Sequence, residues 1–119
     1  MESEVERWLK ELKKGATKFS LMAILRDGDM YGYELMREFE VRTNGFVKLT
    51  EGNAYPTLHN MEDEGLITSY WVNSDSGLPA RKYYHITEKG ALLLNEMIIG
   101  WEGYMNAMSN IWRHKSGNQ

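Results

Sequence analysis

The stretch TEGNAYPTLHNMEDEGLI, which runs from Thr50 to Ile67, contains the pattern that decides the fold of this chain. Ala54, Leu58 and Met61 are spaced by four and then three residues, so they share one face of an α-helix. Pro56 lies in the same segment, and we expect it near the start of the helix, where backbone N–H groups have no intrahelical acceptor. The pattern therefore predicts a short helix that buries one face and leaves the other free.

The residues around this helix predict its ends and the character of its free face. Thr50 or Gly52 is the expected N-cap, and Gly65 occupies the place of a left-handed C-cap. The free face is short, uncharged and rich in hydrogen-bonding groups, namely Asn53, Thr57 and Asn60, with Tyr55 and His59 beside them.

Two further helices are predicted before this segment. Between Val5 and Ala23 the apolar residues recur at alternating steps of four and three, and Gly28 ends the helix that this spacing predicts. A second helix should run from Tyr31 to about Val41, with Asn44-Gly45 as its stop. Its partly buried side chains should be Tyr33, Leu35, Met36 and Phe39.

A β-hairpin and a long last helix are predicted after it. Residues 66–72 and 81–86 are rich in aromatic and β-branched side chains, and the turn formers of NSDSGLPA separate them. Thr87 is the expected N-cap of a helix that continues to about Arg113. Its apolar residues again recur at steps of four and three: Leu94, Ile98, Trp101, Met105, Met108 and Trp112.

Composition excludes several classes of protein. The 119 residues are 42% hydrophobic and 26% charged, as in one ordinary globular domain, and the absence of cysteine excludes disulfides and thiolate chemistry. His59, His85 and His114 are scattered, and no phosphate-binding loop or nucleophile elbow is present, so we expect no metal, no cofactor and no enzymatic activity. The first residues lack the apolar segment of a signal peptide, and the longest apolar run is too short to span a bilayer, so we expect a cytoplasmic protein.

The charge of the chain is unevenly distributed. A net charge of −3 and a pI near 5.6 argue against a nucleic-acid partner. However, Lys10, Lys13, Lys14 and Lys18 cluster near the start of the chain, and the Arg81-Lys82 pair forms a second basic spot. The local charge can therefore oppose the total charge.

Three helices followed by a hairpin is the element order of a winged helix-turn-helix protein. The segments GNAYPTLHNMEDEGLITSYW and GLPARKYYHITEKG resemble the PadR family of prokaryotic transcriptional regulators, and most of all its small members with a single C-terminal helix. The resemblance extends from about Lys14 to Trp112. It implies a mainly α fold with a small β-hairpin, in which residues 1–86 form the winged helix-turn-helix and residues 87–119 the dimerisation helix and tail of one compact unit.

The resemblance also implies a function. We expect a homodimeric repressor that binds a double-stranded DNA operator, with its recognition helices in successive major grooves and its hairpin along the backbone. The residues expected to contact DNA are Lys14, Lys18, Tyr31, Asn53, Tyr55, Thr57, Asn60, Arg81 and Lys82. Asn60 and Asp63 stand at positions that are commonly basic in the family, Leu78 and His85 replace frequent arginines, and Asn53-Ala54 stand where Thr-Leu is common. These departures bear on the affinity and the operator sequence more than on the binding mode.

The terminal helices should form the dimer interface, with the last helix of one subunit packed on the first helix of the other. Each helix carries an apolar stripe that a three-helix core cannot fully cover. The expected interface consists of Val5, Leu9, Leu12, Leu94, Ile98, Trp101, Met105, Met108 and Trp112. The alternative is that both stripes pack on each other within one monomer.

Trp101 suggests a site for an effector, because it lies in the middle of the stripe on the last helix. A flat aromatic or hydrophobic molecule could bind there and release the DNA, as in ligand-responsive small members of this family. Its expected lining is Met97, Ile98, Trp101 and Met105, with Trp8, Leu9 and Leu12 from the other subunit. The alternative is a dry dimer core. For the whole protein, the alternative function is a winged-helix module that binds protein through the acidic residues 62–64.

Overall fold

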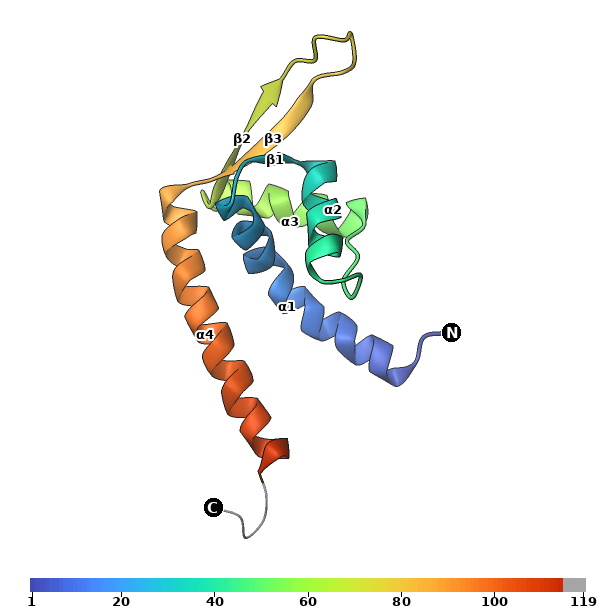
Figure 1. The fold of residues 1–119 in the computed structure, drawn as a ribbon, viewed down its shortest axis with the longest axis vertical. Coiled ribbons are helices and arrows are strands. Elements are labelled where there is room, and N and C mark those ends of the chain that lie inside the picture. The colour runs from blue at the N-terminus through green and yellow to red at the C-terminus, as the bar shows by residue number, and fades with distance from the viewer. Residues whose placement is uncertain (115–119) are drawn as a thin grey trace.

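A computed structural model describes residues 1–114 (Figure 1). The last part of the predicted dimerisation segment, residues 115–119, lies outside the described residues. In chain order the elements are α1 (Glu4–Arg26), β1 (Met30–Tyr31), α2 (Gly32–Arg42), α3 (Glu51–Asp63), β2 (Ile67–Val72), β3 (Arg81–Ile86) and α4 (Glu88–Arg113). The chain is mainly helical with a small antiparallel sheet, as predicted.

Helices α1, α3 and α4 begin at side chains that cap their free N–H groups. Ser3 starts α1 with a capping box, because its hydroxyl accepts from the Glu6 N–H at 3.1 Å while the Glu6 carboxylate accepts from the Ser3 N–H at 3.1 Å. Thr50, and not Gly52, caps α3 by accepting from the N–H of residue 53 at 3.2 Å. Thr87 caps α4 in the same way, as predicted.

The prediction for Pro56 was wrong in its position. Pro56 is the sixth residue of α3, so it lies in the second turn and not among the free N–H groups of the first. Since proline has no N–H, the carbonyl of Gly52 loses its usual helical donor. Both residues are exposed, so water can bond to this carbonyl and the helix continues past the proline.

The sheet has one strand more than the predicted hairpin. β2 and β3 pair antiparallel with Ile67 opposite Ile86, and they project beyond the helices as a wing (Figure 1). β1 adds to the other side of β3, with Met30 opposite Tyr84, which gives the order β1-β3-β2. A strand of two residues is too short to show a periodic pattern, so the sequence did not reveal it.

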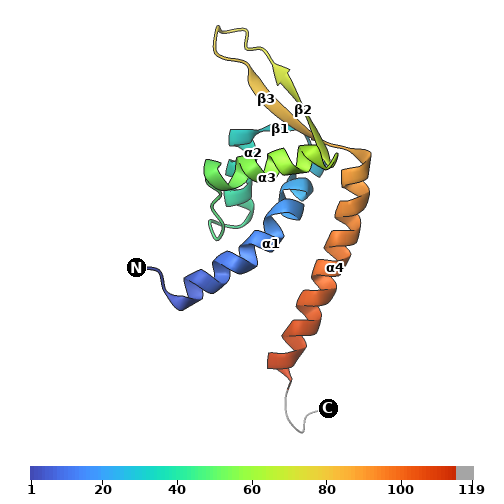
Figure 2. The same cartoon turned by 180° about the vertical axis from the view of Figure 1, so that it is seen from behind.

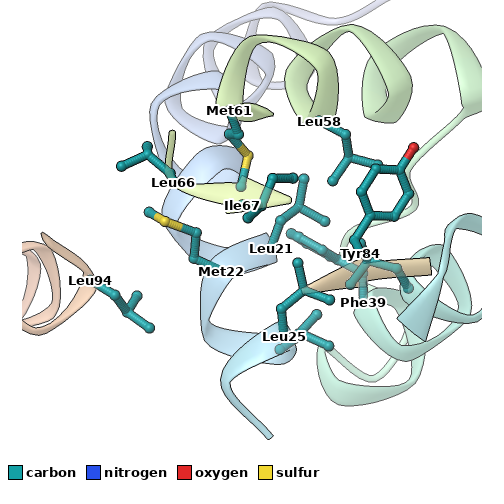
Figure 3. Packing of buried hydrophobic residues seen from close by; sticks show 12 residues of the cluster. Leu21, Met22, Leu25, Phe39, Leu58, Met61, Leu66, Ile67, Tyr84 and Leu94 are labelled. Carbon is teal, nitrogen blue, oxygen red and sulfur yellow. The ribbon is translucent and has the colours of Figure 1, made fainter. Parts of the chain in front are cut away.

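The core lies where α1, α2, α3 and the base of the wing meet (Figure 3). The face of α3 predicted to be buried is buried, with Ala54, Leu58 and Met61 at most 1% exposed. Tyr33 was expected to be partly buried, but it is 63% exposed, because it lies at the start of α2 on the side away from the core. The largest fully buried side chains are Leu21, Met22, Leu25, Leu35, Leu58, Met61, Leu66, Ile67 and Leu94.

α1 and α4 pack together at one end and diverge at the other (Figures 1 and 2). The ring centroids of Phe19 and Trp101 are 5.2 Å apart, and Leu94 is fully buried in the core of its own chain. Toward the outer ends the stripes are open, since Trp8 and Trp112 are 63% and 68% exposed. Within one chain, the two stripes therefore cover each other only in part.

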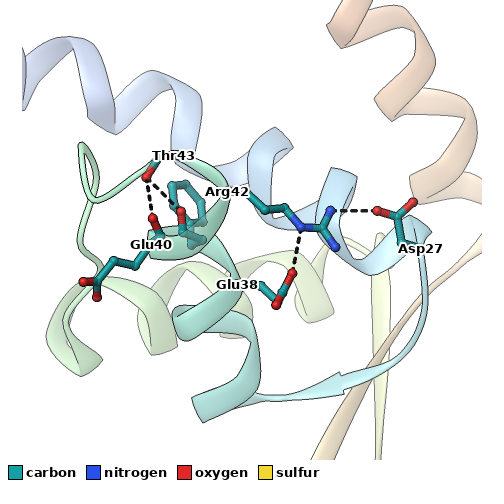
Figure 4. Close-up of polar contacts among 6 residues, drawn as sticks. Asp27, Glu38, Glu40, Arg42 and Thr43 are labelled. Atoms are coloured by element: carbon teal, nitrogen blue, oxygen red, sulfur yellow. Dashed lines mark hydrogen bonds and ion pairs between the residues drawn. The ribbon is translucent and has the colours of Figure 1, made fainter.

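Two joints hold the helices to their neighbours. Arg42 of α2 donates to Asp27 at 2.7 Å and to Glu38 at 2.9 Å, which ties the end of α2 to the end of α1 (Figure 4). At the base of the wing, the Leu66 carbonyl accepts from the Thr87 N–H at 3.1 Å, and the Thr87 hydroxyl lies 2.7 Å from the Gly65 carbonyl and 3.0 Å from the Leu66 carbonyl. The second joint fixes the direction in which α4 leaves the winged domain.

Candidate nucleic-acid interface

The outward face of α3 carries the polar residues that the sequence placed there. Asn53 and Asn60 are exposed, and Thr57 is half-buried with its hydroxyl donating to the Asn53 carbonyl at 3.0 Å. Within residues 1–114 neither asparagine amide forms a hydrogen bond, so each presents donor and acceptor groups from a helix. His59, beside this face, lies 3.5 Å from Asp63.

A basic hollow lies beside the first turns of α3. Its lining includes Lys10, Lys13 and Lys14 from α1 and Lys48 from the segment before α3, and we call it the lysine groove. Its volume is about 400 Å³, and the remaining lining residues are Thr17, Val47, Leu49, Asn53 and Thr57. Lys10, Lys14 and Lys48 each lie near a carboxylate outside the lining, but the lining itself contains four lysines and no acidic residue. The groove therefore concentrates positive charge in an acidic chain.

An aromatic hollow of about 430 Å³ lies on the wing side of α3. We call it the aromatic cleft, and its lining consists of Tyr31, Gly32, Tyr33, Tyr55, Trp71, Arg81, Lys82 and Tyr84. The Arg81 guanidinium lies over the Tyr31 ring, 4.6 Å from its centroid. Lys82 lies 3.5 Å from Glu62 and 5.7 Å from the centroid of the Tyr84 ring. The Lys82 ammonium thus lies between the Glu62 carboxylate and the Tyr84 ring, whereas the Arg81 guanidinium stacks on the neutral ring of Tyr31.

Tyr55 crosses from α3 to the start of α2. A Cβ at position 32 would lie 2.8 Å from Cε1 and 2.9 Å from Cζ of Tyr55, so a side chain at this position would force the ring to move. Burial, together with the charge of Glu51, raises the pKa of the Tyr55 hydroxyl. The hydroxyl is therefore neutral at physiological pH and able to donate a hydrogen bond.

The base of the wing is held by one carboxylate. Asp29 accepts from the Tyr70 hydroxyl at 2.6 Å and lies 2.7 Å from Nδ1 of His85, so it joins both wing strands to the loop before β1. Burial opposes ionisation of Asp29, but the hydrogen bonds from Tyr70 and His85 and the charge of His85 outweigh it and lower the pKa of this carboxyl. This anchor sets the angle of the wing to the helices.

The structure distributes the predicted contact residues around α3. Lys14, Asn53 and Thr57 meet in the lysine groove, and Tyr31, Tyr55, Arg81 and Lys82 meet in the aromatic cleft. Lys18 and Asn60 line a third hollow at the C-terminal end of α3, where Lys18 pairs with Glu64 at 2.9 Å.

Sequence reasoning did not name most of the other lining residues as contacts, and three of them, Lys48, Gly32 and Tyr84, show why. Lys48 directly precedes the N-cap segment of α3, and that position was a signal that could have been used. Gly32 and Tyr84 gave no such signal, because only the packing of β3 against α2 and α3 brings them together.

A profile of the transcriptional regulator PadR-like family matches residues 21–96, which is more than half of the chain. The chain belongs to this family. The negative transcriptional regulator PadR of Bacillus subtilis is 28% identical over 82 residues, which make up 69% of this chain and 44% of that regulator. The chain therefore spans less than half of that relative.

Solved structures of PadR regulators have the same fold. A PadR family transcriptional regulator from Eggerthella lenta has a TM-score of 0.80 and 25% identity, over 93% of this chain and 94% of that one. A PadR-like transcriptional regulator from Bacillus cereus has a TM-score of 0.76 and 33% identity, over 88% and 99%. These PadR proteins are transcriptional regulators and not enzymes, so the prediction of a non-enzymatic regulator is confirmed. Within residues 1–114, no helix has the length and apolar character needed to cross a bilayer.

Proposed function

We propose that this PadR-family regulator binds a double-stranded DNA operator as a homodimer and represses transcription. The observation that carries the proposal is the lysine groove beside the polar face of α3, because it concentrates positive charge at one surface of a chain whose net charge is −3. Neutralising phosphates there releases counterions, which supplies affinity without reading the sequence.

In this arrangement, α3 enters the major groove. The amides of Asn53 and Asn60 can each bond to an adenine edge through one donor and one acceptor, which gives discrimination of about 1–3 kcal/mol per base. Lys14 and Lys18 would contact phosphates on the α1 side. Arg81 would contact them on the wing side, and Lys82 would do so by exchanging Glu62 for a phosphate.

Dimerisation through the terminal helices is supported by apolar side chains at their diverging ends. On α1, Val5, Trp8 and Leu12 are exposed, and on α4, Ile111 and Trp112 are exposed. Monomers rarely leave so many large apolar side chains in water, and a second copy is the partner that would cover them. Leu94 is buried in its own chain, so the proposed contact lies further along α4, at Ile98, Trp101, Met105, Met108 and Trp112, and on α1 it includes Leu9.

A planar hydrophobic effector is proposed to bind between these helices and release the DNA. Trp101 is half-buried against Phe19, and Met97 and Ile98 pack beside it at the edge of the core. Met105 continues this surface, and Trp8, Leu9 and Leu12 of the partner would close it. A molecule bound there would favour dimers in which the two α3 helices no longer match successive major grooves, about 34–36 Å apart.

The DNA-binding proposal is tested by salt dependence. Genomic fragments retained by the protein would be sequenced, and binding to the enriched duplex would be followed by fluorescence anisotropy over a range of salt concentrations. Changing both Lys14 and Lys48 to Gln should reduce the slope of log K against log salt by about 2. Lys89→Gln is the charge-matched control, since Lys89 donates to the Glu64 carbonyl at 2.8 Å outside the lysine groove. An equal change in slope for the control, or no enriched duplex, would refute the proposal.

The dimer and the effector site have separate tests. Changing Ile111 and Trp112 to Glu should give a monomer in sedimentation velocity, whereas Leu92→Glu, on the same helix and equally exposed in one chain, should leave the dimer intact. A monomeric wild type would remove the basis of the dimer proposal.

For the effector, planar aromatic compounds should quench tryptophan fluorescence in the wild type and not in Trp101→Ala. The protein-binding alternative is not favoured, since Glu62 and Glu64 are engaged by Lys82 and Lys18.

A further inference from the structure

The lysine groove is larger than a contact with the DNA backbone requires. Its volume of about 400 Å³ is within the range of pockets that hold small molecules, and its walls come from α1, from α3 and from the segment before α3. A duplex is a stiff rod, so it can lie across the mouth of this hollow and contact lysines at the rim, but it cannot enter. The proposed function therefore does not account for the interior of the groove.

Apolar side chains form the floor of the groove. Val47 and Leu49 are half-buried and pack against the core, so the core holds them in place. The Thr17 hydroxyl donates to a carbonyl of its own helix at 2.9 Å, and the Thr57 hydroxyl does the same at 3.0 Å, so neither hydroxyl adds a free donor. Such a floor favours a ligand with a carbon-rich body, because covering apolar surface releases water.

Four ammonium groups surround this floor. Lys13 is held by neutral groups, since its Nζ lies 3.4 Å from the Phe46 carbonyl oxygen and 5.0 Å from the centroid of the Phe46 ring. The other three lysines lie 2.8–4.0 Å from carboxylates outside the lining, and the side chains in these pairs are 35–76% exposed. Water screens such pairs, so an anion inside the groove can engage the ammonium groups at little cost. A ligand that engages all four needs several negative charges.

The kind of cation selects the kind of anion. In the part of the chain that the structure describes, every cationic side chain of this lining is a lysine. An arginine fork suits a planar carboxylate through two parallel bonds, whereas an ammonium acts as a point charge with three donors. Four point charges around one hollow suit closely spaced negative groups with many oxygens, as in a chain of phosphates. The Asn53 amide, in the same lining, can bond to the edge of a polar ring.

We propose that the lysine groove binds a soluble organic polyphosphate of the nucleoside triphosphate class, with its carbon-rich body on Val47 and Leu49 and its phosphates among the four lysines. Binding there excludes the duplex from α3, because Asn53 belongs both to the lining and to the face proposed to read bases. Only this second step rests on the proposed function. Inorganic polyphosphate presents the same charge without an apolar body, so the floor decides between the two sources.

Isothermal titration calorimetry with ATP and with inorganic triphosphate, both without divalent cations, measures the binding. The wild type should bind ATP more tightly than triphosphate. Changing Lys13 and Lys48 together to Gln removes one charge from α1 and one from the facing segment, and it should weaken the binding of both probes about ten-fold or more. Changing Lys18 and Lys89 together to Gln is the charge-matched control outside this lining, and it should leave both affinities within about two-fold.

Val47→Thr tests the floor, because it keeps the shape of the side chain and replaces one methyl group by a hydroxyl. It should weaken ATP binding about four-fold and leave triphosphate binding unchanged. Urea midpoints measured on every variant show that each protein is folded. Equal affinities for the two probes, unchanged by Val47→Thr, would overturn the organic ligand.

Displacement of a labelled duplex by ATP, at constant ionic strength, tests the exclusion of DNA. Half-displacement from Val47→Thr should need about four times more ATP than from the wild type. If ATP binds and the duplex stays bound, the exclusion is wrong.

If neither probe binds, or if the variant lacking Lys13 and Lys48 binds ATP as tightly as the wild type, the groove ligand is overturned. Duplex binding by the wild type then leaves the proposed function standing. If the wild type binds no duplex, the proposed function fails, and ATP binding that depends on Lys13 and Lys48 still supports the groove ligand.

Discussion

Gly90→Ala tests the joint that sets the direction of α4. Gly90 lies in the first turn of α4 against the start of β2 and the end of β3, and a Cβ there would collide with the backbone carbonyl of Leu66 and lie 3.0 Å from Cγ1 of Ile86. The same carbonyl accepts from the Thr87 N–H and lies 3.0 Å from the Thr87 hydroxyl. Since a backbone group cannot rotate away as a side chain can, the helix and the wing must separate.

The size of the effect follows from three contributions. Overpacking a closed site costs about 1–3 kcal/mol, and loosening the bonds to the Leu66 carbonyl costs about 1 kcal/mol more. The better helix propensity of alanine returns at most about 1 kcal/mol. We therefore expect Gly90→Ala to lower the free energy of unfolding by about 2–3 kcal/mol, a large fraction of the stability of a small domain.

Urea unfolding followed by circular dichroism, at one fixed protein concentration, would measure this loss as a midpoint lower by about 1 M or more. Gly15→Ala is the control, because a Cβ on this exposed glycine of α1 would meet nothing within 4 Å. It should raise the stability by up to about 1 kcal/mol. If Gly90→Ala is as stable as the wild type, the close packing of α4 on the wing is wrong.

Two further predictions concern α3 and the wing. Pro56→Ala should raise the free energy of unfolding by about 1–2 kcal/mol. Alanine restores an N–H donor to the Gly52 carbonyl, and part of this gain is offset because the unfolded chain gains conformational entropy. A lower urea midpoint would contradict this prediction. Asp29→Asn should flatten the acid limb of the stability curve between about pH 5 and pH 3. The pKa of Asp29 is lower in the folded chain than its value of about 3.9 in the unfolded chain. Its carboxylate therefore stabilises the fold fully above the unfolded pKa, and this stabilisation is lost as the pH falls through the folded pKa. Equal acid limbs in both proteins would rule out this anchor.

The regular elements were predictable because each carries a local pattern. The spacing of Ala54, Leu58 and Met61 placed the buried face of α3, and Thr87 marked the N-cap of α4. Pro56 was misplaced because the preference of proline for the start of helices does not show where a given helix starts. The start of α3 depends on its capping residue, which is Thr50. Tyr33 was misjudged because its face of α2 is decided by where α1 and the sheet lie.

The candidate site could be predicted only in part. The polar face of α3 and the basic pair Arg81-Lys82 were visible in the sequence, because they belong to single elements. The ion pair of Lys82 with Glu62 was not visible, since it joins residues from two elements. The position of Tyr84 in the aromatic cleft was hidden for the same reason, because a period-two pattern predicts burial of a strand residue and not what lies above it.

The sequence by itself determined the element order, the faces that are apolar, and the membership in a family of transcriptional regulators, because periodicity, capping residues and turn formers act within a few neighbouring positions. Only the tertiary structure decided the third strand, the lysine groove, the aromatic cleft and the joint at Gly90. Each of these arises where segments that are far apart in the chain meet. Their geometry depends on how side chains fill the space between elements, and no local pattern contains that information.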